Sequence, residues 1–551
     1  MNKALHTTRT ALAAGVLTVL TVAAGCKLPG GTDYYEVEVP RDRVRNIENL
    51  ELPTAGPADG NDAAQAPASA DANITAPAQL ELTLEDARTL ALQNNLDLKV
   101  QLMNPAIADQ RVSEEEARFE AAMFSNIRYS KTDTPTSSLL SGSSVDASSA
   151  DLGVRVPLRT GGTLTFDVAE SRVKTNNIFS TLNPAYDADA SISLSQPLLR
   201  GAGVRANTHA IRIASYDRQI TDARTKLEII NVLAAADRLY WRLYAARRQL
   251  EVRRQQYDLA QAQLEQAVRF VDSGRRSQIE VVRAEAGVAQ RLEAIITAEN
   301  DLRDRQRELK RAMNRAGLDM STSTILVPAT EPVPIRYELD PNSLVAQAMD
   351  NRMELLELEV QLAQDISTID YLTNQALPQA TLDYTYNLNG LGGTRRDAYD
   401  LMFDNRFSDH RFGLQVLVPL GNQAAESRVR QAWFARRQRI ASRQSREKLI
   451  ELEVLNAIDQ VEANWQRILA GRQRTILDGR LYEAEKRQFS LGLNTTNDVL
   501  EAQTNYADAQ TAEILALTEY QIALVDLAYS TGTLLGKARI HWDPITPSES
   551  Q

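Results

Sequence analysis

Two stretches of this sequence carry mostly apolar residues at every seventh position, and the second stretch repeats the first 218 residues later. Apolar residues sustained at this spacing predict long helices that pack as coiled coils, not a compact globular core. The chain is therefore expected to be a tandem duplication of long helices. The paired positions are Ala236 and Val454, Leu243 and Val461, Leu250 and Ile468, Tyr257 and Thr475, Leu264 and Tyr482, and Val271 and Phe489.

Each unit is predicted to contain a helix, a glycine turn and a returning helix. Gly274 and Gly492 occupy equivalent turn positions under the same shift. A helix of nearly 70 residues is roughly 100 Å long at about 1.5 Å per residue. Small residues such as Ala246, Ala260 and Ala267 lie between the larger heptad residues and would let neighbouring helices pack closely. The expected helices cover residues 204–272 and 277–315 in the first unit and residues 423–490 and 496–535 in the second.

The two halves also begin alike, at a different shift of 257 residues. Residues 84–98 predict one short helix, and residues 344–355 repeat its latter part. The shift changes because the first half is longer between this helix and the coiled coil.

Strands are expected between the short helix and the long hairpin in each half. Residues 381–388 and 411–418 alternate in the second half, residues 191–195 alternate in the first, and Ile127 and Tyr129 share a face. Period two with one polar face fits a transmembrane barrel. The alternative is a soluble two-faced sheet, but so few strands in a mostly helical chain would not form one alone. We therefore favour a barrel completed by other subunits.

The first half carries an additional predicted hairpin. Residues 151–156 and 163–168 also alternate, and Arg159-Thr160-Gly161-Gly162 joins them as a turn. The sequence leaves open whether this hairpin joins the barrel wall or caps it from outside.

The N-terminus has the pattern of an export signal. A short basic segment precedes the uncharged, mostly apolar residues 11–25, which are too few to span a membrane. The small residues before Cys26, the only cysteine, resemble a bacterial lipoprotein cleavage site, and Lys27 then implies sorting to the outer membrane. The alternative is ordinary signal cleavage with an incidental cysteine. Residues 65–79 are rich in Ala, Pro, Asp and Ser, which predicts a linker.

Composition excludes several other classes of protein. The net charge of −11 disfavours a basic nucleic-acid binder, and one Cys with four scattered His excludes a disulfide framework and disfavours a zinc site. Residues 532–537 resemble a phosphate-binding loop only faintly, because the spacing is one residue short and Ala538 replaces the required Ser or Thr. We interpret this segment as a helix end and expect no cofactor, no metal and no enzymatic activity.

Taken in order, these features resemble the TolC-like outer-membrane efflux family over residues 82–536. The fold class implied is mainly α with a transmembrane β-barrel. The resemblance implies a homotrimer in which each subunit gives four strands to a 12-stranded barrel and four helices to a periplasmic tunnel. The motifs that carry it are Leu82-Thr83-Leu84-Glu85-Asp86-Ala87 with Asn94-Asn95, Leu377-Pro378, Ser195-Gln196-Pro197-Leu198, Val418-Pro419-Leu420, and Gly492 followed by Asp498-Val499-Leu500-Glu501-Ala502.

The domain division follows from the repeats and the resemblance, which also implies an equatorial collar from the inter-repeat segment and the C-terminus. The parts are a signal peptide (1–25), a lipid-anchored flexible linker (26–81), repeat 1 (82–315), an inter-repeat equatorial segment (316–340), repeat 2 (341–535) and a C-terminal tail (536–551).

The resemblance also implies where functional residues lie. Gly274 and Gly492 would end the hairpins farthest from the membrane and dock a periplasmic adaptor protein. Asp498 and Glu501 match acidic positions that ring the periplasmic mouth, where like charges would raise one another's pKa. Glu280 matches an acidic position in the gate network. The alternative is that all three carboxylates are exposed helix residues near a hairpin tip.

The chain departs from the family pattern next to this mouth. Phe489 stands where a gating Tyr can occur, and Asn494 replaces an Arg. The closing contacts of other members therefore do not transfer, and Arg275, Arg276 or Arg283 are candidates to replace them.

The function implied is a passive, lipid-anchored conduit in the bacterial outer membrane, driven through the adaptor by an inner-membrane pump of RND or ABC type. Drug efflux, metal efflux and protein secretion, including type I secretion, share this architecture, so the exported substrate stays open. The competing hypothesis is a structural coiled-coil lipoprotein of the envelope without a pore.

Overall fold

The computed structural model describes residues 79–137 and 142–540, and residues 74–551 form one compact unit. The predicted signal peptide, Cys26 and nearly all of the linker lie outside the described residues. Within the described part of the chain, none of the helices combines the length and the apolar character needed to cross a membrane.

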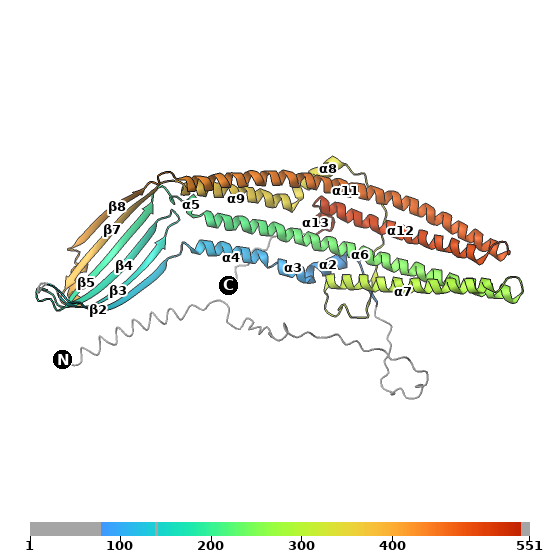
Figure 1. The fold of residues 1–551 in the computed structure, drawn as a ribbon, viewed down its shortest axis with the longest axis horizontal. Coiled ribbons are helices and arrows are strands. Elements are labelled where there is room, and N and C mark those ends of the chain that lie inside the picture. Colours follow the sequence, from blue (N-terminus) through green and yellow to red (C-terminus); the bar gives the residue numbers. More distant parts are fainter. Residues whose placement is uncertain (1–78, 138–141, 541–551) are drawn as a thin grey trace, which may run out of the picture. The chain divides into compact units, whose positions relative to one another are not determined.

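Two long helical hairpins dominate the described chain (Figure 1). In repeat 1, α6 (His209–Asp272, 64 residues) returns as α7 (Ile279–Met313, 35 residues). In repeat 2, α11 (Gln423–Ser490, 68 residues) returns as α12 (Thr496–Ser530, 35 residues). The predicted helices are confirmed, except that Thr208 separates the short α5 (Val204–Asn207) from α6, and α12 ends before α13 (Leu534–Lys537).

Most heptad positions lie in the seam of each hairpin. Near the first tip, however, Tyr257, Leu264 and Val271 are only half-buried, and the buried residues are Gln256, Ala260, Gln263 and Ala267. Leu243, Val454 and Val461 are buried, and the small residues Ala260 and Ala267 are each only 1% exposed. Side chains of this size bring the helix axes close together, so the predicted coiled-coil packing is confirmed along the seam.

The short helices attach beside the long ones. They are α2 (Leu84–Asn94), α3 (Leu96–Gln101) and α4 (Asn104–Ala117) in repeat 1, and α8 (Pro341–Asn351) and α9 (Met353–Gln375) in repeat 2. The prediction of one continuous helix over residues 84–98 is wrong. Asn95 leaves the helical backbone and its side chain accepts a hydrogen bond from the Leu98 amide at 2.9 Å, so a new helix begins there.

The inter-repeat segment is tied into the helical core. Its strand β6 (Ile325–Pro328) pairs in parallel with β1 (Gln79–Leu82). The fully buried Tyr240 of α6 donates its hydroxyl to the Leu82 carbonyl at 3.1 Å and accepts from the Thr330 amide at 2.8 Å. One side chain therefore fastens both segments to the first long helix.

Six antiparallel strands form one open sheet. The strand order is β2-β3-β4-β5-β7-β8, so β2 and β8 are its two edges. The strands are β2 (Ala122–Asp133), β3 (Ser144–Pro157), β4 (Thr163–Thr175), β5 (Ala185–Pro197), β7 (Gln379–Gly392) and β8 (Ser408–Leu417).

The additional predicted hairpin belongs to this sheet. It is β3 and β4, which lie between β2 and β5 and pair with both along their length. The resemblance implied four strands per subunit, whereas the described part of this chain has six in one sheet. The predicted turn is confirmed, because Gly161 has a φ of 94° and its amide donates to the Leu158 carbonyl at 2.8 Å.

The register places apolar and polar residues on opposite faces of the sheet. The apolar face is strongly exposed, with Phe412 at 77% and Ile127 at 73%. On the other face, Ser191 donates to Asp167 and Ser195 donates to Asp383. The apolar face continues across all six strands through Met123, Ile127, Tyr129, Leu152, Val154, Leu164, Phe166, Val168, Ile192, Leu194, Leu382, Tyr384, Leu388, Phe412, Leu414 and Val416.

One helix that the sequence did not predict covers part of the apolar face. Within the β7–β8 connection, α10 (Arg395–Phe403) packs Ala398 and Met402 against Ala188 of β5. Gly390 of β7 permits this approach, since a Cβ there would lie 2.0 Å from the Ala398 carbonyl oxygen.

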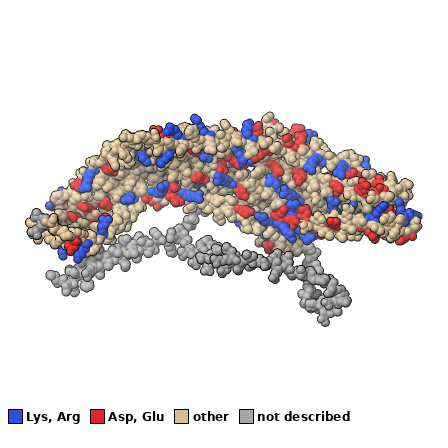
Figure 2. All heavy atoms as spheres, in the orientation of Figure 1, with Lys and Arg blue, Asp and Glu red and all other residues tan. Residues whose placement is uncertain are grey.

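Charged side chains are spread over the helices. In Figure 2, acidic and basic residues alternate along the visible face, and neither sign gathers into one large patch. Ion pairs connect neighbouring helices, such as Arg439 of α11 with Asp365 of α9 at 2.7 Å. Arg439 thus contributes a contact between helices.

Candidate functional site

The two hairpin tips have the same backbone geometry. The Gly274 amide donates to the Val271 carbonyl at 2.9 Å and the Arg275 amide to the Phe270 carbonyl at 2.9 Å. At the second tip, the Gly492 and Leu493 amides make the equivalent bonds, each 3.0 Å long. This is the Schellman motif, which needs a positive φ at its glycine. The φ values are 68° at Gly274 and 81° at Gly492.

Both tip glycines face open space. A Cβ added to either glycine would have no heavy atom within 4 Å. A side chain there would cost backbone strain of about 1–2 kcal/mol without a steric clash inside the chain. The tips can therefore carry substitutions that probe what contacts them from outside.

A guanidinium connects the two tips. Arg276 of repeat 1 donates to the Asn494 carbonyl of repeat 2 at 2.5 Å, and its guanidinium carbon lies 5.5 Å from the ring centre of Phe489. Phe489 is fully buried and its ring centre is 5.7 Å from that of Phe270. The Asn494 side chain bonds to Glu485 of its own repeat. We call Arg276, Phe489 and Asn494, together with Glu280, whose contacts are described next, the tip bridge.

Glu280 supplies the second connection. Its carboxylate accepts the Thr496 backbone N–H at 3.0 Å and forms an ion pair with Arg283 at 2.8 Å. Thr496 is the first residue of α12, so Glu280 places a negative charge at the positive end of that helix. Burial alone raises the pKa of Glu280, but the bond from Thr496 and the charges of Arg283 and Arg276 outweigh it, and the pKa lies below its ordinary value.

Asp498 has a different local role. Thr495 and Asp498 form a capping box at the start of α12, with the Thr495 amide donating to the Asp498 carboxylate at 2.9 Å and its hydroxyl at 2.8 Å. These bonds lower the pKa of Asp498. Within one chain the pKa of Asp498 is therefore lowered, whereas a ring of like charges is expected to raise it. Glu501, one turn further on, is exposed.

The predicted site residues thus separate into groups. Arg276, Glu280, Phe489 and Asn494 come together in the tip bridge, and the exposed Arg275 does not take part. Sequence reasoning missed the Thr496 amide, Phe270 and Glu485. It also missed the capping box, although Thr-x-x-Asp ahead of an apolar run is a readable signal.

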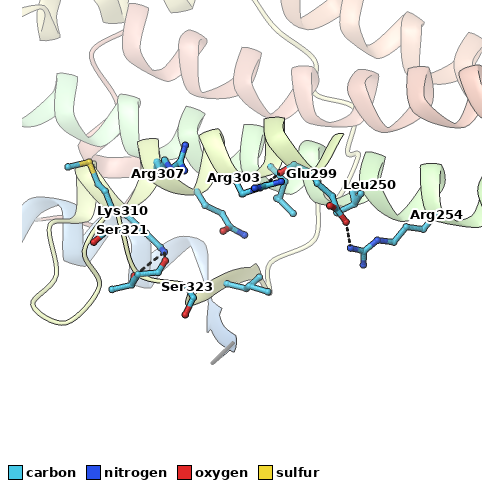
Figure 3. Close-up of a pocket in the computed structure, with 13 residues that line it drawn as sticks. Leu250, Arg254, Glu299, Arg303, Arg307, Lys310, Ser321 and Ser323 are labelled. Atoms are coloured by element: carbon cyan, nitrogen blue, oxygen red, sulfur yellow. Dashed lines mark hydrogen bonds and ion pairs between the residues drawn. The ribbon is translucent and has the colours of Figure 1, made fainter. Parts of the chain in front are cut away.

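A cavity of about 720 Å³ lies where residues 320–325 pass α6 and α7 (Figure 3). All four of its basic side chains have partners in the chain, and Arg303 donates to the Glu299 carbonyl at 3.3 Å. Arg254 pairs with Glu299 at 2.8 Å, Arg307 with Asp304 at 3.2 Å, and Lys310 donates to the Thr322 carbonyl at 2.8 Å. Burial lowers the pKa of Lys310, and Arg307 adds to this effect. The cavity is accordingly best explained by the docking of the inter-repeat segment.

A family model described as outer membrane efflux protein matches residues 163–315 and 344–533. No curated protein sequence matches the chain significantly.

Solved structures share the fold. A membrane protein from Pseudomonas aeruginosa matches with a TM-score of 0.63 and 16% identity over 82% of this chain and 93% of that one. The CmeC outer membrane channel of Campylobacter jejuni matches with a TM-score of 0.60 and 14% identity, over 82% of this chain and 86% of that one. The open state of the MtrE outer membrane channel of Neisseria gonorrhoeae matches with a TM-score of 0.57 and 14% identity, over 82% of this chain and 89% of that one.

The tip bridge makes a prediction about Glu280. Glu280→Gln should increase hydrogen exchange at the Thr496 amide by roughly tenfold or more, because a bond to a charged acceptor is worth about 1.5–3 kcal/mol. Since the pKa of Glu280 is lowered, protection in the unmodified chain should persist below pH 4.5 and disappear as the pH falls through the lowered value. Exchange measured by mass spectrometry on peptides from residues 490–500 tests this.

The matched control is Glu285→Gln, which removes an exposed carboxylate from the same helix. It should leave exchange at Thr496 unchanged. Equal exchange in both variants would contradict the assigned role of Glu280.

Proposed function

Because the chain belongs to the outer membrane efflux protein family, we propose that it is the channel subunit of a tripartite efflux or secretion system. Three copies form a passive conduit from the periplasm to the exterior, with a transmembrane barrel and a helical periplasmic tunnel. An inner-membrane pump of RND or ABC type supplies the energy through a periplasmic adaptor. The solved structures of this fold named above as channels are outer-membrane proteins, which fits a function without catalysis.

The exposed apolar face of the sheet is the observation that carries this proposal. Large apolar side chains exposed together mark a surface made for lipid or protein. The opposite face carries Ser and Asp side chains that hydrogen-bond along the strands. An apolar outside and a polar inside are what a membrane pore requires.

The lateral edges support a ring of copies. Among the residues that the structure describes, the edge strands β2 and β8 each leave one side unpaired, and an unpaired edge is a template for another strand. The helical segments beside these edges, α3 and α4 on one side and α11 on the other, expose apolar residues as well. Contact between two different edges is heterologous, and it forms a ring when the rotation between copies closes. The exposed apolar residues of the helical segments are Leu96, Val100, Met103 and Ile107 at one edge and Trp433, Phe434, Leu449 and Leu452 at the other.

The competing function is a structural envelope lipoprotein without a pore. The purified full-length protein in planar lipid bilayers distinguishes the two. A conduit should give discrete conductance steps, whereas a structural lipoprotein should give none.

The first prediction concerns adaptor docking. Gly274→Trp combined with Gly492→Trp should abolish pump-dependent export while leaving assembly intact, because both positions face open space at the tips. Export of a pump substrate from cells, with native gel analysis of the assembled protein, measures both effects.

Gly317→Trp is the matched control, because Gly317 also has a positive φ of 78° and open space around its Cβ position. It should cause similar backbone strain away from the tips and preserve export. Export that survives the double tip substitution would place docking elsewhere.

The second prediction concerns ion selectivity. Asp498 and Glu501 are three residues apart on one helix face, and three copies would place six carboxylates around the periplasmic mouth. The capping bonds favour the charged form of Asp498 at neutral pH. We expect a cation-selective pore that multivalent cations block from the periplasmic side.

Asp498→Asn with Glu501→Gln removes both charges at constant size and should weaken both effects, measured as reversal potential in a salt gradient. Asp304→Asn with Glu308→Gln, on exposed positions of α7, is the control and should change neither. Selectivity unchanged by the first pair would mean that these carboxylates face away from the pore.

The third prediction concerns the lipid anchor. We expect the mature chain to begin at an acylated Cys26, so the intact mass of detergent-extracted protein should include acyl chains. Cys26→Ala should lose that mass and still assemble, because the barrel alone should anchor the protein in the membrane. A mature chain that starts elsewhere and carries no lipid contradicts the proposal.

A further inference from the structure

The sheet contains more strands than there are helices that lead directly into it. The helices α4, α6, α9 and α11 pack side by side in that order. Each continues into one strand, respectively β2, β5, β7 and β8, and these strands follow the same order in the sheet. Only the β3–β4 hairpin lacks a helix of its own, and it lies between the strands of α4 and α6 (Figure 1).

This hairpin is built into the sheet along its whole length. β3 pairs with β2 from Ser144 to Arg155, and β4 pairs with β5 from Thr163 to Val173. Its turn is also fastened at the helical end. The Thr160 carbonyl accepts from the Gly203 amide at 3.0 Å and from the Gln196 side chain at 3.2 Å.

The hairpin has the same two faces as the other strands. Leu152 of β3 and Val168 of β4 are opposite each other on the apolar face. Asp167 accepts from Ser191 of β5 on the polar face. A plug or an external cap would not need both faces in register with the wall, so the hairpin has the pattern of a wall element.

The width of the six-stranded sheet agrees with that of the helical layer. With strands about 4.8 Å apart and tilted by about 40°, six strands span roughly 38 Å and four span roughly 25 Å. Four helices with axes 8–10 Å apart span roughly 32–40 Å. The six-stranded sheet can therefore continue from the helical layer without tapering.

The free edges allow the sheet to close through neighbouring copies. β2 runs away from the helices and β8 runs back toward them, so β8 of one copy can pair with β2 of the next in the antiparallel arrangement used throughout the sheet.

From these observations we propose that the trimer closes on an 18-stranded barrel whose lumen is as wide as the helical tunnel, so that the exit admits hydrophilic cargo as bulky as the tunnel itself can pass. This inference rests on the proposed function, since it takes three copies from it. A barrel of 18 strands measures roughly 35 Å between opposite backbones, against roughly 24 Å for 12 strands. Barrels of 16–18 strands enclose an open aqueous channel.

The test compares the full-length protein with a variant in which a short turn replaces residues 134–184, joining β2 directly to β5. The matched control replaces only the β4–β5 connection, residues 176–184, and keeps all six strands. Polyethylene glycols of increasing size, added from the exterior side of a planar bilayer, report the width of the exit through the change in single-channel conductance.

The full-length protein and the loop control should admit polymers of at least about 1.5-fold larger radius than the hairpin-deleted variant. Electron-microscopic projections of full-length particles along the three-fold axis provide a measurement that does not depend on any variant folding, and should show the wider ring. Conducting trimers with a ring of 12-strand width would overturn this inference alone. Absence of both trimers and conductance would overturn the proposed function, and this inference with it.

Discussion

The seam between each long helix and its returning partner is the contact on which the rest of the structure depends. Helices of 64 and 68 residues are too long to be enclosed by one domain core. α11 therefore buries a narrow stripe, and α6 is enclosed on most sides only in its middle part, around Leu233 and Tyr240. Small residues such as Ala260 and Ala267 keep the axes close. The resulting layer sets the width that the sheet must match and holds the two tips beside each other.

Periodicity alone predicted most of the fold. Heptad spacing and strict alternation show which face of a helix or strand is apolar, and the apolar face is the one that packs against other elements. The prediction of 423–490 agrees with α11, and every segment predicted as a strand lies in the sheet apart from Val418, one residue beyond β8. Periodicity failed where one polar side chain competes with the helix, as at Asn95. It also left the extra hairpin unplaced, since alternation describes a strand's faces and not its neighbours.

The candidate site was less predictable for a related reason. The bonds of the tip bridge join residues 216 and 218 positions apart, so no local pattern reveals them. The resemblance identified Glu280, Phe489 and Asn494 as positions of interest, but not what they touch. The substitutions that distinguish this chain from its family pattern are explained once the contacts are known. Phe489 packs on Phe270, and the Asn494 side chain bonds to Glu485.

The duplication itself shows why the two tips are not interchangeable. The 218-residue shift places Ser277 on Thr495 and Glu280 on Asp498, so both repeats carry a hydroxyl and a carboxylate at capping-box spacing. Asp498 uses its carboxylate on its own helix, through Thr495. Glu280 instead reaches across to the first residue of α12.

The same spacing of hydroxyl and carboxylate therefore serves as a local cap in repeat 2 and as a bridge between repeats in repeat 1. Glu280 is committed to the contact between the repeats, and Asp498 to its own helix. The two carboxylates therefore stabilise the tips of one chain through different bonds.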